Sequence, residues 1–234
     1  MKPIAIFRHA PGEGPGYLAE VLTRNAIPFT TICVDKGEAL PPSCAPYAGL
    51  VFMGGPMSVN DALPWIPQTL ALIREAQAAN MPLLGHCLGG QLISKALGGQ
   101  ITKNAVQEVG WGVVERLQNE VAQQWFGRLP SSFEVFHWHG ETFSIPSGAA
   151  HILAGRFCAH QGFAIGRTLA LQCHIEMTPG MIDKWAKSPD GQQLVASPSI
   201  QTAAAFHERL GERLQALHQV ADIVYGQWLE QLCA

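Results

Sequence analysis

Short apolar runs alternate with helical segments over the first hundred residues, and this alternation constrains the fold more than any other feature of the chain. Apolar spacing predicts helices over 17–25, 65–79 and 88–97, and the strand-like runs cover 4–9, 29–34, 49–53 and 82–85. Strands and helices that alternate at this spacing form βαβ units, in which the strands pair in parallel and the helices cover the sheet. We therefore predict an α/β fold with a mainly parallel central sheet flanked by helices.

The second half of the chain has a different pattern. Short strand candidates with turn residues between them predict antiparallel additions to the sheet, at 109–117, 133–137, 151–154, 163–165 and 169–173. After Pro179 the pattern is helical, and apolar residues recur every three or four positions from Phe206 to Trp228, with a break near Gly211. We expect one domain over 1–234, with a C-terminal helical extension over roughly 200–234 whose apolar face packs on the sheet or, alternatively, on a partner.

Composition excludes several classes of protein. Charged residues make up 14% and hydrophobic residues 47% of the 234 residues, which is too apolar for a disordered chain. A net charge of −3 without a basic stretch argues against binding to nucleic acid. No apolar run approaches the roughly 20 residues of a membrane-spanning helix, and the N-terminal apolar run is too short for a signal peptide. We therefore expect a cytoplasmic protein that binds neither membrane nor nucleic acid.

One of the six cysteines lies in a motif that suits a nucleophile. The six are scattered without a C-x-x-C pair, and disulfides are rare in the cytoplasm, so we looked for a reactive thiol. Cys87 is central in Gly-His-Cys-Leu-Gly at 85–89, which follows an apolar run and opens a helix, as in a G-x-S-x-G nucleophile elbow. The glycines leave room for the sharp turn, and the helix N-terminus favours a thiolate. A buried core cysteine in a glycine-rich loop is the alternative.

A second motif places a histidine and a carboxylate at the end of a strand. His174 and Glu176 follow an apolar run, and residues i and i+2 of an extended chain project to the same side. The carboxylate of Glu176 can hold the imidazole of His174 while the ring faces the thiol, which is the nucleophile, base and orienter logic of a catalytic triad. A strand-end histidine beside a solvated glutamate is the alternative.

A third motif offers backbone amides. The apolar run 49–53 ends in Gly54-Gly55-Pro56, so no side chain covers the amides of this turn. Together with the amide of Leu88, the residue after the candidate nucleophile, such a turn can form an oxyanion hole. An ordinary turn from strand to loop is the alternative.

The three motifs together resemble the class I glutamine amidotransferase family, whose triad consists of Cys, His and Glu. The resemblance rests on Gly-Gly-Pro at 54–56, on Gly-His-Cys-Leu-Gly-Gly-Gln at 85–91, on Gln-Cys-His-Ile-Glu-Met at 172–177 and on Trp-His-Gly-Glu at 138–141. It covers roughly residues 45–180. It implies a flavodoxin-like α/β domain that cleaves the side-chain amide of glutamine through a γ-glutamyl thioester and releases ammonia.

The resemblance also implies a role for each site residue. Cys87 would be the nucleophile, His174 the base and acid, and Glu176 the orienting carboxylate. The oxyanion-hole amides would come from Gly55 and Leu88, and the substrate contacts from Gly54, Gln91 and His139.

Two positions depart from the pattern of the family. Ile175 stands where the family often has proline, and His86 stands where it usually has an apolar residue. Neighbouring residues at an elbow point away from each other, so we expect His86 to be buried or hydrogen-bonded and not to act as the base. The His137-x-His139 pair lacks a third ligand at a telling spacing, and no G-x-G-x-x-G or G-K-[ST] motif occurs, so we expect no metal and no cofactor.

The sequence leaves the physiological reaction open. We predict a glutaminase-type cysteine hydrolase similar to the glutaminase domain of GMP synthase. Its ammonia acceptor would be a separate synthase subunit, since the chain has no ATP-binding or synthase segment. The alternatives are a stand-alone γ-glutamyl peptidase that acts on glutathione-like compounds, a DJ-1-like redox or deglycase protein, and a non-catalytic regulatory subunit. No pattern in the sequence indicates an oligomeric state.

Overall fold

The alternating pattern of the first half folds into parallel strands joined by helices. The computed structural model describes residues 2–232, so Cys233 lies outside the described residues. The parallel part of the sheet consists of β1 (Ile4–Arg8), β2 (Phe29–Cys33), β3 (Gly49–Phe52), β4 (Leu83–His86) and β9 (Thr168–Leu171). Between these strands lie α1 (Tyr17–Arg24), a 3₁₀ helix (Val34–Lys36), α2 (Trp65–Ala78) and α3 (Leu88–Ala96).

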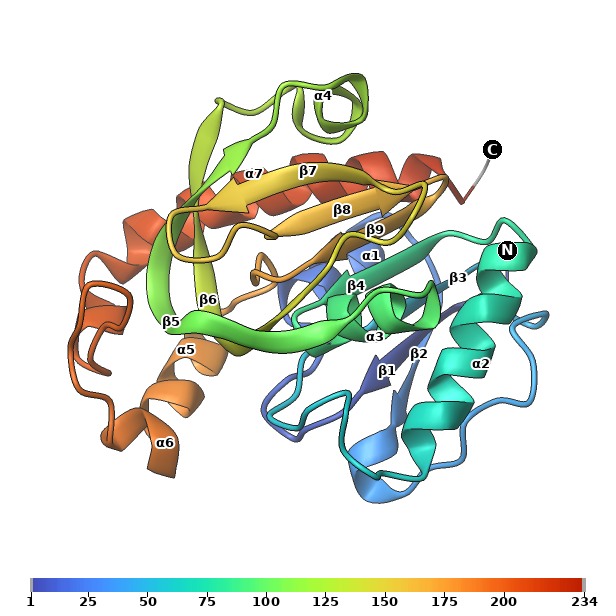
Figure 1. Cartoon of the computed structure of the whole chain (residues 1–234), viewed down its shortest axis with the longest axis horizontal. Coiled ribbons are helices and arrows are strands. Elements are labelled where there is room, and N and C mark those ends of the chain that lie inside the picture. Colours follow the sequence, from blue (N-terminus) through green and yellow to red (C-terminus); the bar gives the residue numbers. More distant parts are fainter. Residues whose placement is uncertain (1, 233–234) are drawn as a thin grey trace.

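The second half adds four antiparallel strands at one edge of the sheet (Figure 1). They are β5 (Ile101–Arg116), β6 (Ser132–Phe143), β7 (Ala150–Gly155) and β8 (Gly162–Ile165). The strand order is β2-β1-β3-β4-β9-β8-β7-β5-β6. The predicted α/β fold, mainly parallel with antiparallel additions, is therefore confirmed.

The two strands of the β5–β6 hairpin are longer than the sequence pattern predicts. We expected strands over 109–117 and 133–137, and we did not expect α4 (Glu120–Phe126) between them. Most residues in the first half of β5 are exposed, so this half carries no apolar alternation that would reveal a strand. It is held instead by backbone pairing with β6, in which Lys103 lies opposite Glu141.

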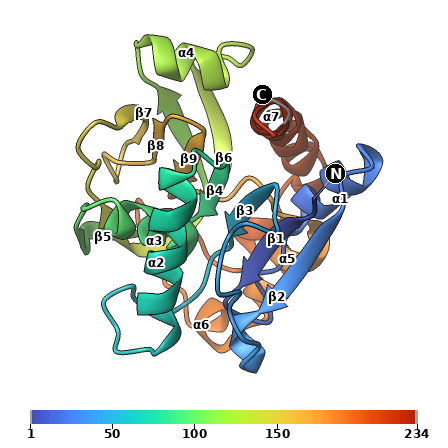
Figure 2. The ribbon, with the colours of Figure 1, turned by 90° about the vertical axis from the view of Figure 1, so that its right-hand side faces the viewer.

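The central strands face two separate cores. In β1, Ile4 and Ile6 pack in one core, and Ala5 and Phe7 pack in the other. The first core is shared with α1 and with the C-terminal helix α7 (Leu210–Glu230), and the second is shared with α2 and α3. Figure 2 shows these two pairs of helices on opposite faces of the sheet. A strand buried on both faces needs apolar residues at every position, which explains the continuous apolar runs.

The C-terminal part of the chain is helical, as the sequence predicts. It contains α5 (Pro179–Ala186), the single turn α6 (Pro189–Gln192), a 3₁₀ helix (Ala205–His207) and α7. The break predicted near Gly211 corresponds to the start of α7. The apolar face of α7 is buried in the first core, through residues that include Leu217, Val224 and Trp228. Among residues 2–232, no helix combines the length and apolar character needed to cross a membrane.

The carboxyl ends of the parallel strands bring the predicted motifs together. A loop over 9–16 follows β1, the Gly54-Gly55 turn follows β3, Cys87 follows β4, and His174 lies shortly after β9. Because these strands run in the same direction, their ends meet at one edge of the sheet. This edge is where open α/β sheets bind their ligands.

Candidate active site

Cys87 lies on a sharp turn between β4 and α3. Its backbone has φ 49° and ψ −108°, a conformation with positive φ that is uncommon for a residue other than glycine. The glycines of the motif are required by close packing around this turn. A Cβ on Gly85 would lie 2.6 Å from the backbone of Gly89, and one on Gly89 would overlap the carbonyl group of Phe52. The turn therefore has the local geometry of a nucleophile elbow.

His174 lies between Cys87 and Glu176. Its Nδ1 is 2.6 Å from Oε1 of Glu176, and the thiol of Cys87 is close enough to the ring to influence its charge. The backbone amide of His174 donates to the carbonyl of Phe136 in β6 at 2.8 Å, which fixes the segment after β9. All three polar side chains are buried. The structure thus brings together the thiol, the imidazole and the carboxylate that the sequence singles out.

The electrostatics of this group favour an imidazolium beside an ionised carboxylate. Burial opposes the charged form of His174, but the charge of Glu176 and the hydrogen bonds with Cys87 and Glu176 outweigh it and raise the pKa of His174 well above its usual value. Burial also opposes the charged form of Glu176, yet His86 and His174 lower the pKa of this carboxyl to about 2.

A second histidine contacts the other oxygen of Glu176. Nδ1 of His86 is 3.4 Å from Oε2 of Glu176, and Nε2 of His86 is 3.2 Å from the hydroxyl of Tyr225 in α7. Burial lowers the pKa of His86, so the ring is neutral near pH 7. A neutral ring can accept from Tyr225 at Nε2, while its Nδ1 lies against Oε2 of Glu176 without forming an aligned hydrogen bond. His86 is therefore buried and hydrogen-bonded, as the sequence suggests, and it supports the carboxylate rather than the thiol.

The predicted oxyanion amides lie beside the thiol. Gly55 lines the same cavity as Cys87, and Leu88 is the first residue of α3, where amides have no acceptor within the helix. A Cβ on Gly55 would come within 2.7 Å of the Leu88 side chain, so the two residues are adjacent. His9, which the sequence analysis missed, holds this turn because its Nδ1 donates to the carbonyl of Met53 at 2.9 Å.

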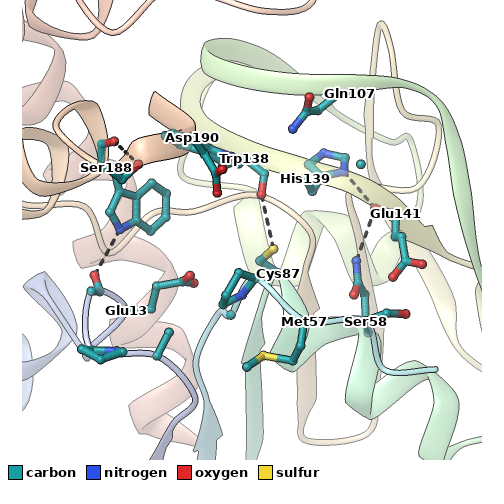
Figure 3. Close-up of a pocket in the computed structure, with 18 of the residues that line it drawn as sticks. Glu13, Met57, Ser58, Cys87, Gln107, Trp138, His139, Glu141, Ser188 and Asp190 are labelled. Carbon is teal, nitrogen blue, oxygen red and sulfur yellow. Dashed lines mark hydrogen bonds between the residues drawn. The ribbon is translucent and has the colours of Figure 1, made fainter. Parts of the chain in front are cut away.

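A cavity of about 630 Å³ opens in front of Cys87 (Figure 3). Gln91 and His139, two of the residues predicted to bind substrate, line this cavity. The side-chain amide of Gln91 donates to the carbonyl of Glu141 at 3.3 Å and to Oε1 of Gln172 at 3.2 Å. Gln172 in turn places its Nε2 3.7 Å from Sγ of Cys87. The sequence analysis quoted Gln172 within a motif but assigned it no role.

Gly54 is placed differently from the other predicted substrate contacts. It is not among the residues that line the cavity. A Cβ at this position would overlap the carboxylate of Glu13 and would lie 3.1 Å from Cε1 of His174. Gly54 therefore leaves space for Glu13, a cavity residue that the sequence analysis did not find.

Glu108, His137 and His139 form a buried cluster next to the cavity. One ligand atom of each lies within 4.8 Å of the others, so the three offer the donor set of a metal site. Oε2 of Glu108 lies 3.0 Å from Nε2 of His139 and accepts a 2.7 Å hydrogen bond from Gln161. Nδ1 of His139 donates to the carbonyl of Glu141 at 2.9 Å. Through these contacts Glu108 holds the His139 ring in place. Glu108 is the third member of the cluster, and the sequence spacing did not reveal it because only the pairing of β5 with β6 brings it next to His139.

The fold and the site together define a class of protein. It is an α/β protein with a cysteine on an elbow at the carboxyl edge of a parallel sheet, beside a histidine that contacts a buried glutamate. The family model for glutamine amidotransferase class-I matches residues 18–185. The chain therefore belongs to the class I glutamine amidotransferase family.

Individual relatives agree with this assignment. The glutamine amidotransferase-like protein YfeJ of Salmonella typhimurium is 29% identical over 151 residues, which are 62% of this chain and 63% of that protein. A glutamine-hydrolysing GMP synthase of Thermomicrobium roseum is 31% identical over 55% of this chain but over only 23% of its own length, so the chain matches one part of that protein. A glutamine amido transferase crystal structure from Methylobacillus flagellatus has a TM-score of 0.95 and 38% identity, over 99% of this chain and 95% of that one.

Proposed function

We propose that the protein is a cysteine hydrolase that cleaves γ-glutamyl amides through a γ-glutamyl thioester on Cys87. The observation that carries the proposal is that Cys87 lines the cavity beside His174, whose Nδ1 is paired with Glu176 at 2.6 Å. Family membership supports it, because glutamine is itself a γ-glutamyl amide. The same evidence favours an enzyme over a non-catalytic subunit, since none of these three residues is missing.

The residues divide the reaction into two steps. The thiolate of Cys87 attacks the amide carbon, and the oxygen that becomes negative accepts hydrogen bonds from the amides of Gly55 and Leu88. His174 gives its proton to the amide nitrogen, the C–N bond breaks and an amine leaves. His174 then takes a proton from water, which attacks the thioester, and glutamate leaves while Cys87 regains the proton.

Glu176 and His86 act through His174. Oε1 of Glu176 fixes the ring so that one nitrogen faces the thiol, and its charge stabilises the imidazolium. His86 and Tyr225 restrain the second oxygen of the carboxylate. Glu176 and His86 are therefore positioning residues, because they act on the thiol only through the ring of His174.

The shape of the cavity favours an enzyme that acts on larger γ-glutamyl compounds over one that only releases ammonia to a synthase. The cavity continues past Cys87 to Trp185 and Asp190, which leaves room for a leaving group larger than ammonia. We therefore propose a single amidotransferase-like domain that needs no partner subunit. Transfer of ammonia to a separate synthase is the second candidate, and it is favoured by the similarity to GMP synthases.

The test is the release of glutamate from free glutamine, glutathione and a γ-glutamyl anilide by the purified chain. We expect Cys87→Ser to lower the rate by at least about a thousandfold, because no other group can form the thioester. Cys33→Ser, at a partly exposed cysteine on β2, is the matched control and should keep the wild-type rate. If Cys87→Ser keeps more than a few per cent of the activity, another residue is the nucleophile and the proposal is wrong.

A further inference from the structure

We infer that the cavity contains a second subsite, in which the carboxylate of Glu13 binds a protonated amine on the leaving group of the substrate. The inference rests on the proposed function and names its substrate class, which is the γ-glutamyl amides of diamines. The reacting carbonyl would lie at Cys87, the glutamyl part on one side of it and the cationic tail on the other.

The thiol divides the cavity into two sides. Figure 3 shows Gln107, His139 and Glu141 on one side of Cys87, and Glu13, Ser188 and Asp190 on the other. The first side contains the residues expected to bind the glutamyl group. The second side is therefore the one that a leaving group enters.

Glu13 is a carboxylate without a partner. In the described part of the chain its side chain makes neither a hydrogen bond nor an ion pair, although it lies beside His174 over the space left by Gly54. Burial raises the pKa of this carboxyl to about 7, and the charge of His174 offsets only part of that effect. Glu13 is partly exposed to the cavity, and a cation that pairs with it would stabilise its ionised form, so the site is suited to a cationic ligand.

The loop that carries Glu13 is held in place on both sides. The backbone amide of Tyr17 donates to the carbonyl of Glu176 at 2.8 Å. Nζ of Lys184 donates to the carbonyl of Pro11 at 2.9 Å, and Nε1 of Trp185 donates to the carbonyl of Gly12 at 3.1 Å. The carboxylate is thus preorganised by contacts with α5 and with the segment that carries the triad, which lowers the entropic cost of binding.

The charges around the cavity favour an amine over an acid. Three carboxylates line it, those of Glu13, Glu141 and Asp190. The ammonium of Lys184 also lines it but donates to a backbone carbonyl of the Glu13 loop. On the side of Glu13, the two carboxylates of Glu13 and Asp190 outnumber the ammonium of Lys184, so a leaving group with a free carboxylate, such as the dipeptide part of glutathione, would meet a net negative charge, whereas an ammonium would meet opposite charge.

The chemistry balances with the groups already present. The S–C bond to Cys87 forms, the C–N bond breaks, and the proton of His174 goes to the nitrogen that leaves. The distal ammonium group keeps its proton and its contact with Glu13 until the diamine dissociates. Water then hydrolyses the thioester to free glutamate.

The test compares two amides of equal length, γ-glutamyl-1,4-diaminobutane and γ-glutamyl-butylamine, which differ in the terminal ammonium. We expect the wild-type chain to have a kcat/KM at least about tenfold higher for the cationic amide. In Glu13→Gln this ratio should fall to within about twofold of unity. Glu120→Gln removes the same charge from the exposed first turn of α4, outside the cavity, and should leave the ratio at its wild-type value.

Calorimetric titration with 1,4-diaminobutane itself separates the subsite from the reaction. We expect the diamine to bind the wild-type chain and to bind Glu13→Gln about tenfold more weakly. If neither amide is hydrolysed, the proposed function fails, and the titration alone supports or overturns the subsite. If both amides are hydrolysed at equal rates, or if Glu13→Gln keeps the wild-type ratio, the hydrolase stands and the subsite is wrong.

Discussion

Glu176 is a buried carboxylate between two histidines, and its environment explains how a single residue can orient the site. His174 contacts one of its oxygens at 2.6 Å, and His86 contacts the other at 3.4 Å. The shorter contact joins it to the ring that moves protons, and the longer one joins it to a neutral ring that serves as support. A change at Glu176 should therefore affect the reaction through His174.

We predict that Glu176→Gln loses less activity than His174→Ala. His174 moves protons directly, and its removal should cost about 10³-fold or more in kcat, whereas the loss of orientation should cost roughly tenfold less. Without the charge of Glu176 the pKa of His174 falls, so the alkaline limb of the kcat/KM profile should move to lower pH. Rates across pH for both variants measure this, and equal losses with an unmoved profile would remove the orienting role.

The residues that we propose as reactive could be predicted from the sequence because each lies in a short motif with a local signature. Cys87, His174 and Glu176 are of this kind, and so are the two oxyanion positions. Glu13 and His9 could not be found, because their roles depend on neighbours that only the parallel sheet brings close. No neighbouring residue in the sequence distinguishes Glu13 from a glutamate exposed on a loop. Its position in the cavity depends on the space over Gly54 and on the nearby ring of His174, which are distant in the sequence.

At the scale of elements, α7 reaches the site from the opposite end of the chain. Tyr225 of α7 contacts His86 of β4, and Trp228 donates its indole N–H to the carbonyl of Leu83 at 3.1 Å. The sequence predicted the apolar stripe of this helix but not the hydroxyl within it that serves the triad. The first half of β5 could not be predicted for a similar reason, because its exposed polar residues form a strand by backbone pairing and show no apolar alternation.

We predict that the hydroxyl of Tyr225 and the ring of His86 are energetically coupled. Tyr225→Phe leaves a buried ring nitrogen without a partner, and His86→Leu leaves a buried hydroxyl without one, so each should cost about 1–3 kcal/mol in the free energy of unfolding. The double variant should cost clearly less than the sum. Urea unfolding of the four proteins measures this, with Tyr47→Phe at a half-buried site as the control, and additive costs would contradict the contact.

At the scale of the whole molecule, several histidines are buried in their neutral form. His9 and His137 lie in separate parts of the sheet, and burial lowers their pKa values to about 4 and about 3. Both would take up a proton below about pH 6.5 once the chain unfolds, whereas the folded protein resists protonation down to much lower pH. The unfolded state therefore binds more protons in this range, and folding stability rises with pH.

We predict that each of these two histidines lowers the free energy of unfolding by about 2 kcal/mol as the pH falls from 7 to 5. Denaturant titrations at several pH values measure this decrease. His9→Gln should make the decrease smaller, whereas His207→Gln at an exposed histidine should not change it. Glu13 and His174, whose pKa values are raised, act in the opposite direction, so the variant comparison decides: a decrease that is the same in His9→Gln and in the wild type would contradict the neutral burial of His9.

The most direct test of the central claim is intact-protein mass spectrometry during turnover of a γ-glutamyl anilide. If Cys87 forms the thioester, acid quenching during turnover should trap a species heavier by one γ-glutamyl group, and peptide mapping should place the group on Cys87. The adduct should be absent from Cys87→Ser and present in Cys33→Ser. Steady release of the aniline with no adduct at any quench time, or an adduct on a different residue, would contradict the account.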